Sequence, residues 1–273
     1  MKIVLASINS KYIHSSLGVW YLHSAAKTAG TDHKVEVYES TINNHIDDIV
    51  ADIYNLNPDV VGFSCYIWNI EQTLYISKQL KKKTNAKIIL GGPEVAYRAK
   101  DVLNQYDFVD FVLSGEGEFN LPKLIDALNL KTDFNDVDGL CYRQNNDVLS
   151  NAEKEYTETP PNPYCDEFFE NLKGRICYIE TSRGCPYRCA FCLSGRCSPL
   201  RFFDLARVKE DIIRLATSGT QTVKFVDRTF NANEKRANEI LTFIKENYGK
   251  TIPQNVCFHF EIEGDILDKE TIA

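Results

Sequence analysis

The sequence predicts an α/β protein of two domains, each built on a parallel β-sheet. Short, nearly continuous apolar runs alternate with longer segments whose apolar residues recur at helical spacing. Strands of this kind are typical of parallel sheets that are buried on both faces. The chain has 273 residues, enough for about two such domains. A proline-rich stretch, YTETPPNPYCDEF, separates an earlier set of strands from a later one.

Residues 1–135 are expected to form the first domain. Its predicted strands are residues 2–7, 34–40, 60–65, 86–92 and 110–115, and the predicted helices are residues 16–29, 45–55, 70–83, 95–105 and a segment after 115. This alternation predicts a doubly wound sheet of flavodoxin-like size, in which ligands bind beyond the carboxyl ends of the strands. The candidate binding loops are therefore SINSKYIHSS, SCYIWN, GGPEVA and SGEGE. None of them contains G-x-G-x-x-G or a P-loop, which argues against a nucleotide site.

Residues 136–172 are expected to hold a β-hairpin, GLCYRQNNDVLSN, and then the proline-rich linker. From residue 173 to 273 the α/β pattern resumes, with predicted strands at 175–182, 221–227 and 256–262 and predicted helices at 204–218 and 232–247. A complete (β/α)₈ barrel needs ~250 residues. We therefore expect these units to be the first three of a barrel that belongs to a longer, C-terminally truncated enzyme.

The charge and hydropathy of the chain limit the compartments and partners that we expect. A formal net charge of −7 favours neither nucleic acid nor an anionic membrane surface. No run approaches the ~18 apolar residues of a membrane span, and the start MKIVLASINS lacks a signal-peptide core. We expect a cytoplasmic protein without nucleic-acid or membrane partners.

Nine cysteines are present, and the stretch RGCPYRCAFCLSG crowds Cys185, Cys189 and Cys192 into one loop, with Cys197 just beyond. In a reducing compartment such a cluster indicates a metal site more than disulfides. A zinc site normally takes two ligand pairs, and Cys197 could complete it as a fourth ligand. Three thiolates on a four-iron cluster instead leave one iron open. The remaining thiols in apolar segments are expected to be small buried residues: Cys65, Cys141, Cys177 and Cys257.

The spacing C-x₃-C-x₂-C after a predicted strand, with Phe191 before the third cysteine, resembles the radical S-adenosylmethionine (SAM) superfamily. The resemblance implies that Cys185, Cys189 and Cys192 bind a [4Fe–4S] cluster and that SAM binds the open iron, with Phe191 at its adenine. The cluster, reduced by a donor such as flavodoxin or ferredoxin, would cleave SAM to a 5′-deoxyadenosyl radical. Asp227 and Glu261, at the ends of the next two strands, are candidates for SAM binding or for capping the following helices.

The loops of the first domain resemble the cobalamin-binding domain of B12-dependent radical SAM enzymes. The segments that carry the resemblance are VGFSCYIWN, ILGGPEVA and DFVLSGEGE, in order and after successive predicted strands. The residues expected at cobalamin are Ser7, Tyr12, His14, Ser64, Gly91, Gly92, Pro93, Gly115 and Glu116. The motif D-x-H-x-x-G is absent, because Tyr12 precedes His14 by two residues and Leu17 follows it by three.

The resemblance covers the whole chain and includes the anaerobic magnesium-protoporphyrin monomethyl ester cyclase group. It implies a radical SAM methyltransferase or an oxidoreductase of the cyclase type. Such an enzyme would transfer a methyl group to an unactivated carbon, or cyclise at one, on a small-molecule or natural-product substrate. The alternative is a non-catalytic zinc- or cluster-binding regulatory protein whose Rossmann-type first domain serves as a scaffold.

Overall fold

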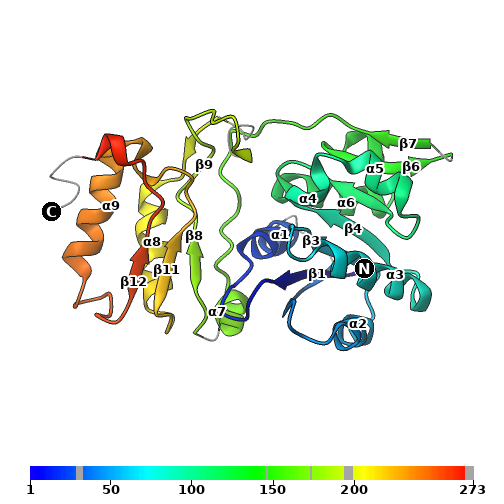
Figure 1. Ribbon diagram of the computed structural model, residues 1–273, viewed down its shortest axis with the longest axis horizontal. Helices are drawn as coiled ribbons and strands as arrows, with labels where there is room; N and C mark the ends of the chain where they lie inside the picture. Colours follow the sequence, from blue (N-terminus) through cyan, green and yellow to red (C-terminus); the bar gives the residue numbers. More distant parts are fainter. Residues whose placement is uncertain (29–32, 146, 173, 194–198, 268–273) are drawn as a thin grey trace. The chain divides into compact units, whose positions relative to one another are not determined.

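The computed structural model describes residues 1–28, 33–145, 147–172, 174–193 and 199–267. The chain divides into two compact units, Met1–Cys165 and Asp166–Ala273. Figure 1 shows that each unit has its own β-sheet. The α/β fold class is therefore confirmed, and each unit is described by itself below.

The first unit is built on a sheet of strand order β2-β1-β3-β4-β5-β6-β7. Its parallel part consists of β1 (Lys2–Asn9), β2 (Lys34–Thr41), β3 (Val60–Ser64), β4 (Lys87–Gly91) and β5 (Phe111–Leu113). The order 2-1-3-4-5 is that of doubly wound, flavodoxin-like sheets. The winding direction reverses between β1 and β3, which makes the carboxyl ends of these two strands the switch point where ligands bind in such sheets.

Helices cover this sheet and bury its apolar side chains. They are α1 (Leu17–Thr28), α2 (Ile46–Asn55), α3 (Ile70–Lys83), α4 (Pro93–Ala96), α5 (Ala99–Gln105) and α6 (Gly117–Leu128). Residues of α2, α3 and α5 pack in one core with Ala6, Val61 and Leu90 of the sheet, whereas α1 contacts α6. The single helix expected at 95–105 is two helices, because Arg98 leaves helical dihedral angles (φ −135°, ψ 33°) between α4 and α5.

The predicted hairpin is present as β6 (Leu140–Gln144) and β7 (Asp147–Ser150), preceded by a 3₁₀ turn, η1 (Phe134–Asp136). β6 pairs antiparallel with β5, so the hairpin extends the first sheet and lies within the first unit. Cys141 and Tyr142 of β6 are buried. The pairing with β6 covers an edge of β5 that would otherwise expose unpaired backbone groups.

The second unit begins with α7 (Asp166–Leu172) and holds three parallel strands, β8 (Cys177–Ile179), β11 (Thr222–Phe225) and β12 (Cys257–His259). They lie in chain order and are joined by α8 (Leu205–Ala216) and α9 (Glu234–Asn247), as in a (β/α) barrel. A short antiparallel pair, β9 (Ser182–Arg183) and β10 (Arg201–Phe202), flanks the cysteine loop. Two 3₁₀ turns, η3 (Phe230–Ala232) and η4 (Gly264–Ile266), follow β11 and β12.

The cysteines outside the loop are distributed almost as expected. Cys65, Cys141 and Cys177 are buried, whereas Cys257 is exposed, which corrects the prediction for that residue. Cys257 lies on β12, where the two outer residues of the strand are exposed. Alternate residues of a strand point to opposite faces, and an apolar run does not reveal that one face of this strand stays uncovered. None of the described helices is both long and apolar enough to span a membrane.

Candidate functional site

The parallel strands β1, β3, β4 and β5 of the first unit present their carboxyl ends at one edge of the sheet. The pairing register places Ser7 beside Ser64, and Ser64 beside Gly91. Gly91 in turn lies beside Leu113, two residues before Gly115. Residues that are far apart in the sequence and that were predicted as a cofactor site are therefore neighbours in one row across the sheet.

The turn after β4 requires glycine at position 92. Gly92 has φ +104°, and a Cβ there would lie 2.6 Å from the carbonyl oxygen of Cys65. The two loops are also joined by backbone hydrogen bonds, from Cys65 N–H to the Gly91 oxygen (2.7 Å) and from Glu94 N–H to the Cys65 oxygen (3.3 Å). Pro93 then starts α4, where its missing N–H costs no hydrogen bond. The loops after β3 and β4 are thus held backbone to backbone.

Glu39, on β2, organises the loop between β1 and α1. Its Oε2 accepts hydrogen bonds from Asn9 Nδ2 (2.8 Å) and from the backbone N–H of Ser16 (3.0 Å). Its Oε1 accepts one from Trp20 Nε1 (2.8 Å). The carboxylate therefore ties the end of β1 to the start of α1. Sequence reasoning missed Glu39, and no local signal sets it apart, because β2 also carries the acidic residue Glu36.

The predicted residues of this loop differ in accessibility. Ser7 is buried, and its hydroxyl donates to Asn9 Oδ1 (3.1 Å). His14 is half-buried, and its backbone oxygen accepts from Asn9 Nδ2 (3.1 Å). Tyr12 is 68% exposed. Tyr12 is thus exposed to solvent on a loop that is held by the hydrogen bonds of Asn9.

Large apolar side chains are exposed on the loops after β1 and β3 and at the end of α4, and we call them the apolar rim. The apolar rim consists of Tyr12, Ile13, Ile67, Trp68 and Tyr97. Within it the Trp68 ring stacks on the ring of Tyr66, with centroids 4.4 Å apart and an interplanar angle of 5°. These side chains stand on segments that follow neighbouring strands, and exposed apolar groups on adjoining loops are typical of binding sites.

The loop after β3 is fixed from below by a buried amide. Asn69 Nδ2 donates to the backbone oxygens of Ile8 (3.0 Å) and Ser64 (2.9 Å), and Asn69 Oδ1 accepts from Tyr66 N–H (2.8 Å). This side chain joins the carboxyl ends of β1 and β3 at the switch point. It also orders the backbone of Tyr66, whose ring carries the stacked Trp68.

Gly115 and Glu116 form the turn between β5 and α6. Gly115 has φ +74°, and Glu116 occupies the N-cap position of α6, with its backbone oxygen accepting from Phe119 N–H (3.1 Å). Asn120 Nδ2 donates to the Ser114 oxygen (3.2 Å) and closes this turn. The predicted pair therefore lies at the same edge of the sheet as Gly91.

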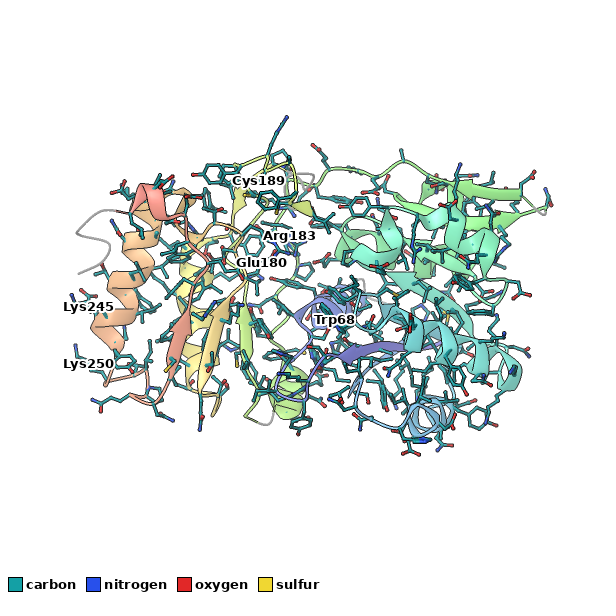
Figure 2. All side chains as sticks on the ribbon, in the orientation of Figure 1. Trp68, Glu180, Arg183, Cys189, Lys245 and Lys250 are labelled. Atoms are coloured by element: carbon teal, nitrogen blue, oxygen red, sulfur yellow. The ribbon has the colours of Figure 1, made fainter. Side chains whose placement is uncertain are left out.

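In the second unit, the cysteine loop follows β8 and β9 (Figure 2). Cys185 is half-buried, with its Sγ 3.5 Å from the hydroxyl oxygen of Thr229. Cys189 is exposed, and its backbone oxygen accepts from Cys192 N–H (3.0 Å). Phe191 is 94% exposed. Cys197 lies outside the described residues.

The three described thiols share one loop without surrounding a common point. Among the described residues, no group of three His, Cys, Asp or Glu side chains is gathered closely enough to hold a metal ion. The donor set nevertheless fits an iron–sulfur cluster, because thiolates are its usual ligands and three of them lie within eight positions beyond a strand. Cluster binding requires these thiolates to converge.

Asp227 follows β11 and is 1% exposed. Its carboxylate accepts hydrogen bonds from Thr181 N–H (3.1 Å), Thr181 Oγ1 (2.7 Å) and Ser182 Oγ (2.5 Å). Burial raises the pKa of this carboxyl above its ordinary value. The described contacts of Asp227 therefore lie within the chain, in the segment that leads to the cysteine loop, and a contact with SAM stays a prediction.

Two further charged residues near this end of the unit have ion-pair partners. Glu261, predicted at the same pocket, is partly exposed and pairs with Lys224 (Oε1 to Nζ, 3.4 Å). Arg183 forms a two-point pair with Glu180, from Nε to Oε1 (2.8 Å) and from Nη2 to Oε2 (2.7 Å). Figure 2 shows Glu180 and Arg183 at the same end of the second unit as Cys189. The charge of Arg183 is thus balanced within the segment before Cys185.

The chain is similar to a known domain family and to several known enzymes. The family model of the B12 binding domain matches residues 2–125. An uncharacterized methyltransferase of Pyrococcus horikoshii is 28% identical over 242 residues, which are 84% of this chain and 52% of that protein. The 2-(S-pantetheinyl)-carbapenam-3-carboxylate methyltransferase of Streptantibioticus cattleyicolor is 31% identical over 190 residues, 64% of this chain and 28% of that protein. The anaerobic magnesium-protoporphyrin IX monomethyl ester cyclase of Synechocystis is 29% identical over 198 residues, 66% of this chain and 38% of that protein.

Solved structures agree with the fold of both units. The radical SAM methyltransferase TsrM from Kitasatospora setae, with cobalamin and a [4Fe–4S] cluster bound, matches 99% of this chain and 56% of its own, at 17% identity and a TM-score of 0.79. The cobalamin-dependent SAM radical enzyme OxsB, with aqua-cobalamin and SAM bound, matches 94% of this chain and 38% of its own, at 20% identity and a TM-score of 0.77. The chain spans about half or less of the length of the curated relatives named above. It therefore carries a B12-binding domain and is a homologue of the cobalamin-dependent radical SAM enzymes, which include methyltransferases and magnesium-protoporphyrin cyclases.

Proposed function

We propose that this chain is the cofactor-binding part of a cobalamin-dependent radical SAM enzyme that acts on an unactivated carbon. The observation that carries the proposal is a C-x₃-C-x₂-C loop after β8 in a chain whose first unit is a B12-binding domain. The reaction is methyl transfer to that carbon or oxidative cyclisation at it. The substrate is a small molecule or natural product, and a cytoplasmic flavodoxin or ferredoxin supplies electrons.

Cobalamin would bind at the carboxyl edge of β1, β3, β4 and β5. Gly91 and Gly92 let neighbouring backbones pack closely at this edge, because a Cβ would lie 3.3 Å from the Leu113 oxygen at Gly91 and 2.6 Å from the Cys65 oxygen at Gly92. The apolar rim offers exposed rings on which an extended, largely apolar macrocycle can lie. Since D-x-H-x-x-G is absent, we propose that the corrin is held by contacts of this kind and not by a histidine ligand to cobalt.

The [4Fe–4S] cluster would bind to Cys185, Cys189 and Cys192, and Phe191 would contact the adenine of SAM. When bound, the cluster supplies the electron for reductive cleavage of SAM, and the corrin supplies a carrier for a methyl group. The chain's own contribution is to order the loop. Segment 180–183 is held at Asp227 and stiffened by the Glu180–Arg183 pair, while Cys189 and Phe191 remain accessible.

Anaerobic reconstitution with iron and sulfide tests the cluster assignment. We expect about four iron and four sulfide ions per chain, and an absorption spectrum that changes when SAM is added. The matched control is the triple variant Cys185→Ala, Cys189→Ala, Cys192→Ala, which should lose the iron while keeping the far-ultraviolet circular dichroism of the parent. One tightly held zinc ion without sulfide would instead identify the non-catalytic alternative.

Titration with hydroxocobalamin tests the first unit separately. We expect a saturable change in the corrin spectrum. We also expect weaker binding by Trp68→Ala, which removes the exposed indole ring that stacks on Tyr66. The control is Tyr75→Ala, because Tyr75 lies on α3 and its ring is exposed to nearly the same extent, 43% against 45% for Trp68. Absence of any spectral change with the parent protein would overturn the cobalamin proposal and leave the first unit as a scaffold.

A further inference from the structure

The segment after β11, residues 227–231, is held firmly on the side of β12. Asn231 makes a reciprocal pair of hydrogen bonds with the backbone of Glu263, from its Nδ2 to the oxygen (2.8 Å) and from the N–H to its Oδ1 (2.8 Å). Phe230 donates its N–H to the Glu261 oxygen (2.8 Å). The Phe230 ring also packs on Phe225 and Phe260, with centroids 5.2 Å and 4.6 Å away.

The same segment is also held on the side of β8. Asp227 accepts three hydrogen bonds from Thr181 and Ser182, in the segment that follows β8. The chain from 181 to 185 and the chain from 227 to 231 are therefore fixed relative to each other by contacts that do not involve the cysteines.

Thr229 projects from this fixed segment to the first cysteine. It is buried, and it occupies the N-cap position of η3 without making a side-chain capping hydrogen bond. Its Oγ1 lies 3.5 Å from Cys185 Sγ. With a neutral thiol either atom can donate, but a thiolate has no proton, so with a thiolate the hydroxyl must be the donor.

We propose that Thr229 is a positioning residue for the iron–sulfur cluster, whose hydroxyl donates a hydrogen bond to the Cys185 thiolate. This inference rests on the proposed cluster site. A hydrogen bond to a ligand sulfur stabilises the more negative, reduced cluster and so raises its reduction potential. Thr229 thereby orients the first cluster ligand, and it favours the electron transfer with which SAM cleavage begins.

The test compares Thr229→Val, which keeps the shape and loses the hydroxyl, with Thr229→Ser, which keeps the hydroxyl. Each protein is reconstituted anaerobically, its iron and sulfide are measured, and its midpoint potential is determined by a redox titration followed by electron paramagnetic resonance. We expect both variants to carry the iron content of the parent. The midpoint potential of Thr229→Val should be more negative, and that of Thr229→Ser should stay near the parent value.

The possible failures are distinguishable. A parent chain that takes up neither iron nor sulfide overturns the proposed cluster site and this inference with it. Full iron content together with equal potentials in Thr229→Val and the parent overturns this inference alone. Thr229→Ala is a second variant without the hydroxyl. If its midpoint potential equals that of the parent while that of Thr229→Val is more negative, the change in potential comes from the shape of the valine side chain. That result would also overturn the proposed hydrogen bond.

Discussion

Asp227 and Thr181 are joined by two hydrogen bonds, one from the backbone N–H of Thr181 (3.1 Å) and one from its hydroxyl (2.7 Å). These residues are 46 positions apart in the sequence, yet their contact joins the ends of two neighbouring strands, β8 and β11. The chain runs from Thr181 directly into the cysteine loop. The buried carboxylate of Asp227, which lies outside the loop, thus fixes the position of the residues from which the loop starts.

This burial predicts a pH dependence of stability. Since burial raises the pKa of Asp227 in the folded protein, the folded state binds its proton more tightly than the unfolded state does. The contribution of Asp227 to the free energy of unfolding is therefore largest at low pH, and it decreases as the pH rises from the ordinary carboxyl range through the raised folded pKa. Chemical denaturation of the parent and of Asp227→Asn over a pH series measures this as their difference.

The control for Asp227 is Asp204→Asn. Asp204 caps α8 by accepting from Arg207 N–H, and asparagine caps helices about as well as aspartate. We expect the difference between the parent and Asp204→Asn to change little over the pH range where the Asp227 difference falls. A difference between the parent and Asp227→Asn that is equally flat would contradict the assignment.

Gly92→Ala should destabilise the first unit more than Gly115→Ala does. Both glycines have positive φ, at +104° and +74°, so alanine at either position incurs a backbone strain of about 1–3 kcal/mol. Only at Gly92 would the added Cβ also collide with backbone, 2.6 Å from the Cys65 oxygen, whereas at Gly115 its nearest neighbour would be Glu153 Oε2 at 3.4 Å. Urea unfolding at equilibrium measures both changes, and equal losses would show that the collision is relieved.

Glu39→Gln should loosen the loop between β1 and α1. The amide offers one acceptor where the carboxylate has two, and its NH₂ group faces a donor, so we expect a loss of about 1–3 kcal/mol in stability. Hydrogen–deuterium exchange should speed up at the amide of Ser16. Glu36→Gln is the matched control, because Glu36 lies on the same strand and makes partly exposed ion pairs with Lys2 and Lys34, worth about 0–1 kcal/mol. Equal effects of the two substitutions would argue against a role of Glu39 in holding the loop between β1 and α1.

Thiol labelling should separate the cysteine loop from the buried cysteines. Burial raises the pKa of Cys65 to about 12, and it also raises the pKa values of Cys141 and Cys177. Cys189 is exposed. With iodoacetamide near neutral pH, peptide mass spectrometry of the native apo chain should find Cys189 modified well before Cys65, since the thiolate is the reactive form. Labelling of both at one rate in native protein, as in a denatured control, would contradict the packing around Cys65.

Much of the fold could be predicted because its signals are local. A buried parallel strand is a short apolar run, and the glycines at 92 and 115 stand where the backbone takes positive φ. Once the strands are parallel, their ends must share an edge, which brings Ser7, Ser64 and Gly91 together. The cysteine spacing is local as well, and it predicts a resemblance to radical SAM enzymes, which are found among the proteins similar to this chain.

Other features depend on contacts between distant segments, which no local pattern encodes. The sequence grouped the hairpin with the linker, and the structure shows that β6 pairs with the edge of β5. The role of Glu39 could not be predicted, because its hydrogen-bond partners Asn9, Ser16 and Trp20 are distant from it in the sequence. The sequence alone determined the parallel strands, the glycine turns and the thiol loop, because each follows from the chemistry of neighbouring residues. Only the tertiary structure decided that Asp227 is buried against Thr181 and that Thr229 meets Cys185, because burial and hydrogen bonding depend on which segments pack together.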